Sequence, residues 1–214
     1  MAGTSDTAAP VRAPRKDAAR NHDALLAAAA EVYAEKGIDG SLEEIARRAG
    51  VGIGTLYRHF PTRDALSEAA YRREVEGLCN AVDGLLERHS PVEALAAWMR
   101  AFAAYVAKKR GMAMALKSAL GPDNELFNYS HRRIREAIGT LVDRAVASGA
   151  IRSDVDSEDL LRAMSGICMA ADSPGWAERT GRLVDLLVDG LRYGAPRPGA
   201  PHPPPGVADR PPSH

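Results

Sequence analysis

The stretch "SLEEIARRAGVGIGTLYRHFPTRDAL", residues 41–66, contains two short helical patterns separated by a glycine. Ser41 and Glu44 have the S-x-x-E spacing of a capping box, which predicts the start of the first helix. Gly50 allows a tight turn after it, because glycine enters left-handed backbone space without a steric penalty. Two short helices joined in this way, with the small Ala46 where they cross, predict a helix-turn-helix.

The second short helix has an unusual outer side. Leu56 and Phe60 are expected to face the core, which leaves small or polar positions outside. These positions are Ile53, Gly54, Thr55, Tyr57, Arg58 and His59. Hydroxyl, phenol, guanidinium and imidazole groups are donors that bind phosphate. A helical hairpin whose aromatic residues merely cap a core remains an alternative for any single residue, but the whole face favours nucleic-acid binding.

The rest of the chain also predicts helices. Its 214 residues are 45% hydrophobic, and Ala, Leu, Arg and Glu favour helix over strand. Gly37, Gly111 and the Gly121–Pro122 pair are expected to end helices. The sequence predicts an all-α fold of about nine helices, in the segments 21–36, 41–50, 51–60, 63–88, 90–110, 112–120, 124–148, 157–171 and 176–193.

Both ends of the chain lack an apolar period. Residues 1–19 predict a flexible basic arm, and the proline-rich residues 195–214 predict a disordered tail. Basic side chains precede the first helix, namely Arg12, Arg15, Lys16 and Arg20. They are expected either to enter a minor groove or to attract phosphate without reading sequence.

Composition excludes several classes of protein. The formal net charge is zero, so nucleic-acid binding must come from local charge placement. The longest apolar stretch, Ala24 to Ala30, is too short to cross a bilayer, and no signal-peptide core precedes it, so a cytoplasmic location is expected. Cys79 and Cys168 have no C-x-x-C spacing, which argues against a disulfide scaffold or a metal site. The motifs HExxH, GxSxG and GxxxxGK[ST] are absent, so neither an enzyme nor a cofactor is predicted.

The quoted stretch resembles the DNA-binding domain of the TetR family of bacterial transcriptional regulators. The resemblance rests on G-T-L-Y-x-H-F followed by Pro-Thr-Arg-Asp, at a fixed distance after S-L-x-x-I-A, and covers residues 20–68. It implies base contacts by Ile53, Gly54 and Tyr57. It implies phosphate contacts by Ser41, Thr55, Arg58, His59 and Arg63. Gly52 departs from the family pattern, in which many relatives carry a serine that caps the helix.

For residues 69–194 the resemblance implies a helical ligand-binding and dimerisation domain. Large apolar side chains at helical spacing are candidates for an apolar pocket: Trp98, Met99, Phe102, Tyr105, Met112, Leu116, Phe127, Met164 and Cys168. Ordinary core packing is the alternative for each of them. Trp98 and Tyr105 are the stronger candidates, because a buried indole or phenol needs a hydrogen-bond partner that a ligand could supply.

The last two helices carry more apolar surface than an internal core needs. The excess predicts a two-fold homodimer through a four-helix bundle that includes Leu160, Leu183, Leu187 and Leu191. The predicted function is a repressor that leaves a near-palindromic operator when a small, largely apolar ligand binds. A DNA-binding dimer that organises DNA or recruits a partner without a ligand is the alternative.

Overall fold

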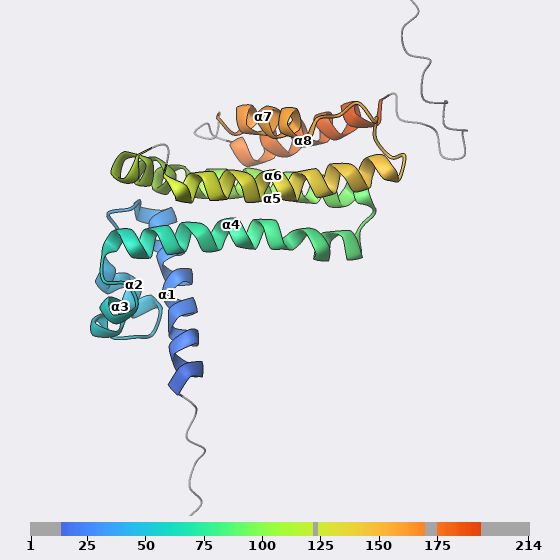
Figure 1. The fold of residues 1–214 in the computed structure, drawn as a ribbon. Helices are drawn as coiled ribbons and strands as arrows, with labels where there is room; N and C mark the ends of the chain where they lie inside the picture. Colours follow the sequence, from blue (N-terminus) through green and yellow to red (C-terminus); the bar gives the residue numbers. More distant parts are fainter. Residues whose placement is uncertain (1–13, 122–123, 170–174, 194–214) are drawn as a thin grey trace, which may run out of the picture. The chain divides into compact units, whose positions relative to one another are not determined.

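The computed structural model of the protein describes residues 14–121, 124–169 and 175–193. In these ranges the chain forms helices and no strand, which confirms the predicted all-α fold (Figure 1). The helices are α1 (Pro14–Lys36), α2 (Leu42–Arg48), α3 (Ile53–His59), α4 (Arg63–Arg88), α5 (Pro91–Leu120), α6 (Glu125–Ala147), α7 (Ser157–Cys168) and α8 (Trp176–Arg192). None of the described helices is long and apolar enough to cross a membrane.

The chain divides into two compact units. The first holds the described residues up to Glu74 together with those of Lys109–Leu126, and the second holds those of Val75–Lys108 and from Phe127 onward. The borders therefore lie inside α4, inside α5 and in the first turn of α6, whereas the sequence suggested one border at residue 68. Part of the predicted ligand-binding region belongs to the first unit.

The core of the first unit is built by α1, the α2–α3 pair and the start of α4. α2 packs against α1 and α3 packs against α2. Leu25, Ile45, Leu56 and Leu66, one from each of these helices, are fully buried. Burying side chains of this kind contributes about 1.5–3 kcal/mol each, so the short helices α2 and α3, of seven residues each, depend on tertiary packing rather than on their own propensity.

The first helix begins earlier than predicted. α1 starts at Pro14, whereas the sequence suggested a start near Asn21, so residues 14–19 of the predicted arm are helical. Proline fits the first turn of a helix, because it lacks only an N–H that would have no intrahelical acceptor there. Residues 1–13 of the predicted arm, with Arg12, and the predicted tail 195–214 lie outside the described residues.

The predicted break at Gly111 is absent, and α5 is one continuous helix. The low helix propensity of glycine suggested the wrong helix end. A single glycine inside a helix lowers its stability by only about 1 kcal/mol, which packing can offset. Lys109 therefore does not lie near a helix end. Its side chain is 2% exposed and forms an ion pair with Glu74 of α4 at 3.5 Å. Ser90 and Pro91 begin α5 as predicted, with the Ser90 N–H donating to the Glu93 carboxylate at 3.1 Å.

In the second unit, α4 and α6 are joined by a polar group around Glu76. Its carboxylate accepts hydrogen bonds from the Tyr129 hydroxyl and from Arg133, whose Nη2 also donates to Asn80 Oδ1 at 3.1 Å. Trp98 of α5 is fully buried, stacks on Phe102 with ring centroids 5.6 Å apart, and donates its indole N–H to the Leu78 carbonyl at 3.0 Å. α7 packs on α8.

Candidate nucleic-acid interface

The turn between α2 and α3 has the geometry that the sequence predicted. Gly50 adopts a left-handed φ of 70°, and its N–H donates to the Arg47 carbonyl at 3.1 Å. The Val51 N–H donates to the Ala46 carbonyl at 3.0 Å, which completes a Schellman motif at the end of α2. Ala46 is buried. The prediction of a helix-turn-helix at residues 41–60 is confirmed.

Only half of the predicted capping box forms at Ser41. The Ser41 Oγ accepts the Glu44 N–H at 3.3 Å, as expected for a helix cap. The reciprocal bond from the Ser41 N–H to the Glu44 carboxylate was predicted wrongly, because Glu44 binds Lys36 and Arg48 instead. The Ser41 hydroxyl donates its proton to Glu43 at 2.7 Å. A phosphate contact by this hydroxyl would have to replace that bond.

The outer side of α3 is exposed. Leu56 and the following Phe60 are buried, as predicted, while the side chains of Ile53 and Tyr57 are 37% and 48% exposed. Gly54 and Arg58 are exposed, and Thr55 is half-buried. Tyr57 and Arg58 form no hydrogen bond or ion pair with any described part of the chain. α3 therefore presents an apolar group, a phenol and a guanidinium to the outside, free for a partner.

Gly54 has no internal reason to be a glycine. Its φ is not positive, and a Cβ at this position would meet no atom within 4 Å. A glycine inside a helix costs about 1 kcal/mol relative to alanine. What the missing side chain offers is room for a partner to approach the backbone of α3 closely.

His59 is less available than the sequence suggested. It is half-buried, and its ring lies 5.9 Å from that of His22 on α1 in an edge arrangement. His22 also contacts Phe60, with ring centroids 5.0 Å apart. These contacts hold the end of α3 against α1. The sequence analysis missed His22, because nothing in the pattern of α1 marks which of its residues meets α3.

Arg63 also has partners within the chain. It is half-buried at the first position of α4, and its Nη1 donates to the carbonyls of Ile38 and Gly40 at 2.8 and 2.6 Å. Both carbonyls belong to the loop between α1 and α2. Its predicted phosphate contact stays a prediction, although one nitrogen of the guanidinium is already in use.

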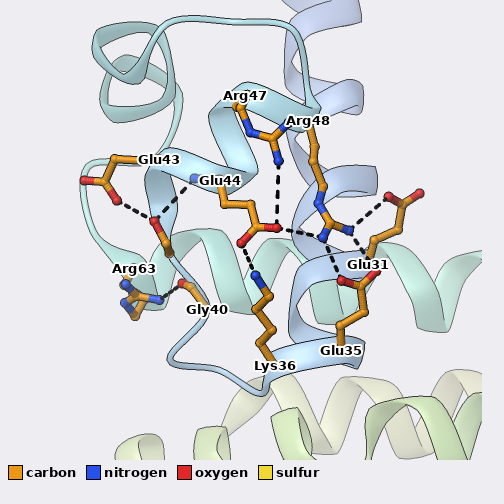
Figure 2. A network of polar contacts seen from close by, with 10 residues as sticks. Glu31, Glu35, Lys36, Gly40, Glu43, Glu44, Arg47, Arg48 and Arg63 are labelled. Atoms are coloured by element: carbon orange, nitrogen blue, oxygen red, sulfur yellow. Dashed lines mark hydrogen bonds and ion pairs between the residues drawn. The ribbon is translucent and has the colours of Figure 1, made fainter.

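An ionic network joins α1 to α2 beside this interface (Figure 2). Arg48 donates to both carboxylate oxygens of Glu35, at 2.8 and 2.6 Å, and to Glu44 at 2.7 Å. Lys36 binds the other oxygen of Glu44. Hydrogen bonds from Lys36 and then Arg48 lower the pKa of Glu44 from its ordinary 4.5 to about 2. The sequence analysis assigned no role to Glu35, Lys36 or Arg48 and used Glu44 only in the capping box, although the Glu44–Arg48 spacing of four is a helical ion-pair signal.

The predicted basic residues of the arm lie in or near the first turns of α1. Arg20 is exposed, and its guanidinium lies 3.4 Å from the Asp17 carboxylate. Arg15 and Lys16 belong to α1, but their side chains lie outside the described part of the structure. A role of these three residues on DNA stays a prediction.

The predicted ligand residues are almost all buried in the structure, and they do not belong to one unit. Met112 and Leu116 belong to the first unit, and the others to the second. All but the half-buried Tyr105 have less than 5% of their surface exposed. The Trp98 indole, expected to need a ligand as partner, has one in the Leu78 carbonyl.

An open hollow of about 490 Å³ lies between α5 and α8 in the second unit. It is lined by Val92, Ala96, Arg100, Asp185 and Val188, among other residues. None of its lining residues is among the predicted ligand residues. The described residues hold no cluster of acidic, histidine and cysteine side chains that could bind a metal.

The predicted dimer residues differ in exposure. Leu160 is buried, so it belongs to the core of its own chain and is not available to a partner. Leu183, Leu187 and Leu191 are half-buried along one side of α8. Leu186, on the same helix, is 67% exposed.

Comparison with known proteins extends these observations. A family profile described as "Bacterial regulatory proteins, tetR family" matches residues 25–70, and one described as "Transcriptional regulator SbtR-like, C-terminal domain" matches residues 90–193. A curated HTH-type transcriptional regulator of Staphylococcus aureus (strain USA300) is 35% identical over 63 residues. The match covers 29% of this chain and 34% of that protein, so the chain spans about a third of the length of the curated relatives it matches.

Two crystal structures match most of the chain. A TetR transcriptional regulator of Streptomyces coelicolor is 47% identical, with a TM-score of 0.74, over 84% of this chain and 99% of the other. A TetR transcription regulatory protein of Mycobacterium vanbaalenii is 32% identical, with a TM-score of 0.70, over 83% and 98%. With the helix-turn-helix and the exposed face of α3, these matches show that the chain belongs to the TetR family of bacterial transcriptional regulators.

Proposed function

We propose that this regulator binds a near-palindromic operator as a two-fold homodimer and represses transcription until a small, largely apolar ligand releases it. The outer face of α3 carries the DNA-binding part of the proposal, because Tyr57 and Arg58 form no hydrogen bond or ion pair with the described chain. The proposed location is the cytoplasm, where bacterial operator DNA lies.

The side chains of α3 fit two tasks on DNA. Ile53 cannot hydrogen-bond a base, so it reads thymine methyl groups by apolar contact. Tyr57 is long enough to reach a base edge or a phosphate, and Gly54 lets the helix lie close to the bases. Arg58, Thr55 and His59 bind phosphates, which fixes the register of the helix. With so few polar base readers, part of the specificity comes from DNA shape.

A two-fold complex compensates for the weak contact of one α3. Its two copies would then read half-sites about 34–36 Å apart, one turn of the DNA helix. Selection of bound duplexes from a random pool tests this, followed by scrambling one half of the selected site. We expect two inverted half-sites and a large loss of affinity after scrambling. Undiminished binding to one half-site would contradict the dimeric operator complex.

The exposed side of α8 is the proposed dimer surface. Leu186 is 67% exposed, and the half-buried Leu183 and Leu187 lie beside it at helical spacing. Leu186→Arg is expected to give monomers in analytical ultracentrifugation and to lose operator binding. Ala177→Arg is the matched control, because Ala177 is also exposed on α8 but lies on the opposite side by helical register. A Leu186→Arg variant that stays dimeric would move the interface elsewhere.

The release step rests on the family and on α4. The family assigns ligand binding to its second domain, and α4 contributes residues to both units of this chain. A ligand that changes the position of α4 would change the spacing of the two recognition helices. Moving the protein from mostly bound to mostly released needs a preference of about 5.5 kcal/mol for the released state, which two ligands can share.

The closed packing around Trp98 favours the second candidate, a DNA-binding dimer without a ligand. Trp98 is fully buried and its indole N–H is already bonded. A panel of apolar metabolites, assayed for release of the selected operator by fluorescence anisotropy, separates the two. Release by one compound class supports the repressor with a ligand. No release by any compound leaves the ligand-free dimer.

A further inference from the structure

Arg63 connects the two ends of the helix-turn-helix. Its Nη1 donates to the Gly40 carbonyl at 2.6 Å, and Gly40 and Arg63 are 23 residues apart. The segment between them contains α2, the turn and α3. Figure 2 shows the Arg63 guanidinium beside the Gly40 carbonyl, with the hydrogen bond between them drawn as a dashed line. The bond therefore closes a loop around the whole reading motif.

The loop that Arg63 holds has little freedom to adapt. Gly40 is buried, and a Cβ there would lie 2.4 Å from Cγ1 of Val32, so the loop is pressed against α1. A carbonyl that is removed from water and left without a donor destabilises the fold. Arg63 supplies charged donors to two carbonyls in part-buried hydrogen bonds, those of Ile38 and Gly40, and hydrogen bonds from a charged donor are stronger than neutral ones.

A phosphate contact would compete with these bonds. The two hydrogens of Nη1 are both used, so turning this nitrogen outward would leave both carbonyls without that donor. Arg58 is the contrast: its guanidinium is exposed and has no hydrogen bond or ion pair in the described chain. Of the two arginines, Arg58 can reach a phosphate without losing a hydrogen bond or an ion pair within the described chain.

We infer that Arg63 is a positioning residue, which clamps the start of α4 to the loop between α1 and α2 and so fixes α3 for reading DNA, rather than a phosphate contact. The consequence for DNA rests on the proposed operator binding. The clamp itself is a property of the free protein.

The clamp is tested first without DNA. In wild-type protein, NMR of the arginine side chains is expected to show slowly exchanging Nη protons on Arg63 and rapidly exchanging ones on Arg58. Arg63→Met, which keeps the length and removes the donors, is expected to speed hydrogen exchange of the amides at 38–44. Freely exchanging Nη protons on Arg63 in the free protein, or unchanged exchange at 38–44 in the variant, would overturn the clamp.

Binding measurements on DNA distinguish a positioning role of Arg63 from a phosphate contact. At a temperature where circular dichroism shows the variant folded, Arg63→Met is expected to lose about tenfold in affinity for the operator and little for random DNA. The slope of log K against log salt stays at the wild-type value, whereas the control Arg58→Met reduces it by about one unit. A reduction of about one in Arg63→Met, with wild-type exchange at 38–44, would make Arg63 a phosphate contact.

Arg63→Lys covers the case in which Arg63→Met does not fold. It keeps the charge, so a phosphate contact predicts wild-type exchange at 38–44, while the clamp predicts faster exchange because lysine lacks the planar fork. If wild-type protein binds no operator, the proposed function fails, and the exchange measurements still decide on the clamp.

Discussion

The outer face of α3 and the α1–α2 network lie in the same unit and are both rich in polar side chains, but they use them in opposite ways. The Arg48 guanidinium is bound to the carboxylates of Glu35 and Glu44, and the Lys36 ammonium is bound to the carboxylate of Glu44. Tyr57 and Arg58, in contrast, form no hydrogen bond or ion pair within the described chain. A basic residue near a helix-turn-helix is therefore a candidate for DNA only after its internal partners are known.

The largest effect on stability is expected at Gly40, where the loop between α1 and α2 packs against Val32 of α1. Gly40→Ala places a Cβ within 2.4 Å of Val32 and should destabilise the first unit by about 1–3 kcal/mol. Thermal unfolding followed through the amide signals of α2 measures this. Unchanged stability would mean that the loop between α1 and α2 can move, which would also weaken the clamp by Arg63.

Tyr57→Ala tests the opposite case, a residue outside the fold. Its side chain is 48% exposed, so we expect unchanged thermal stability and about a tenfold loss of operator affinity with a smaller loss on random DNA. Fluorescence anisotropy on both duplexes gives the ratio. Equal losses on the two duplexes would limit Tyr57 to phosphate contact.

Gly54→Ala is the matched partner of Gly40→Ala. Since a Cβ at position 54 meets nothing, the change should stabilise the unit by up to about 1 kcal/mol while it weakens operator binding. Opposite signs for stability and affinity are the expected result, measured by thermal unfolding and anisotropy. Tighter operator binding would show that DNA does not approach the backbone at Gly54.

The smallest effect concerns pH. The pKa of Glu44 is lowered to about 2, so its contribution to stability is present above pH 4.5 and is lost as the pH falls toward 2. Glu44→Gln should be less stable than wild type near neutral pH and should lose less stability on acidification. Melting of the first unit between pH 2 and 7 measures this. Asp39→Asn, at an exposed carboxylate without an ion pair in the described chain, should follow the wild-type curve.

The sequence predicted those parts of the site that depend on local chemistry. The turn depends on Gly50, the helix cap depends on Ser41, and the buried face of α3 follows from the spacing of Leu56 and Phe60. Each of these signals lies within a few residues of sequence. The contacts of Arg63 with Ile38 and of His22 with Phe60 join residues far apart in the chain. No local pattern encodes them, so they appeared only in the fold.

The same distinction explains the errors in helix boundaries. Gly111 and the residues before Asn21 look like helix ends by propensity, yet α5 and α1 continue through them. Propensity differences of about 1 kcal/mol are smaller than the gain from packing a helix face. For Leu160, periodicity correctly showed an apolar face but could not tell whether the chain's own core or a partner covers it.

The exposure of α3 has a consequence for how such regulators diversify. The side chains of α3 that face outward, Ile53, Tyr57 and Arg58, form no described hydrogen bond within the chain. They can therefore be substituted without the loss of a hydrogen bond that stabilises the fold. If α3 reads the operator as proposed, a duplicated gene can therefore acquire a new target sequence by a few substitutions on this helix that leave the described hydrogen bonds intact. A synthetic circuit can use the same freedom, by grafting other reading residues onto this scaffold while Arg63, Arg48 and Gly40 stay untouched.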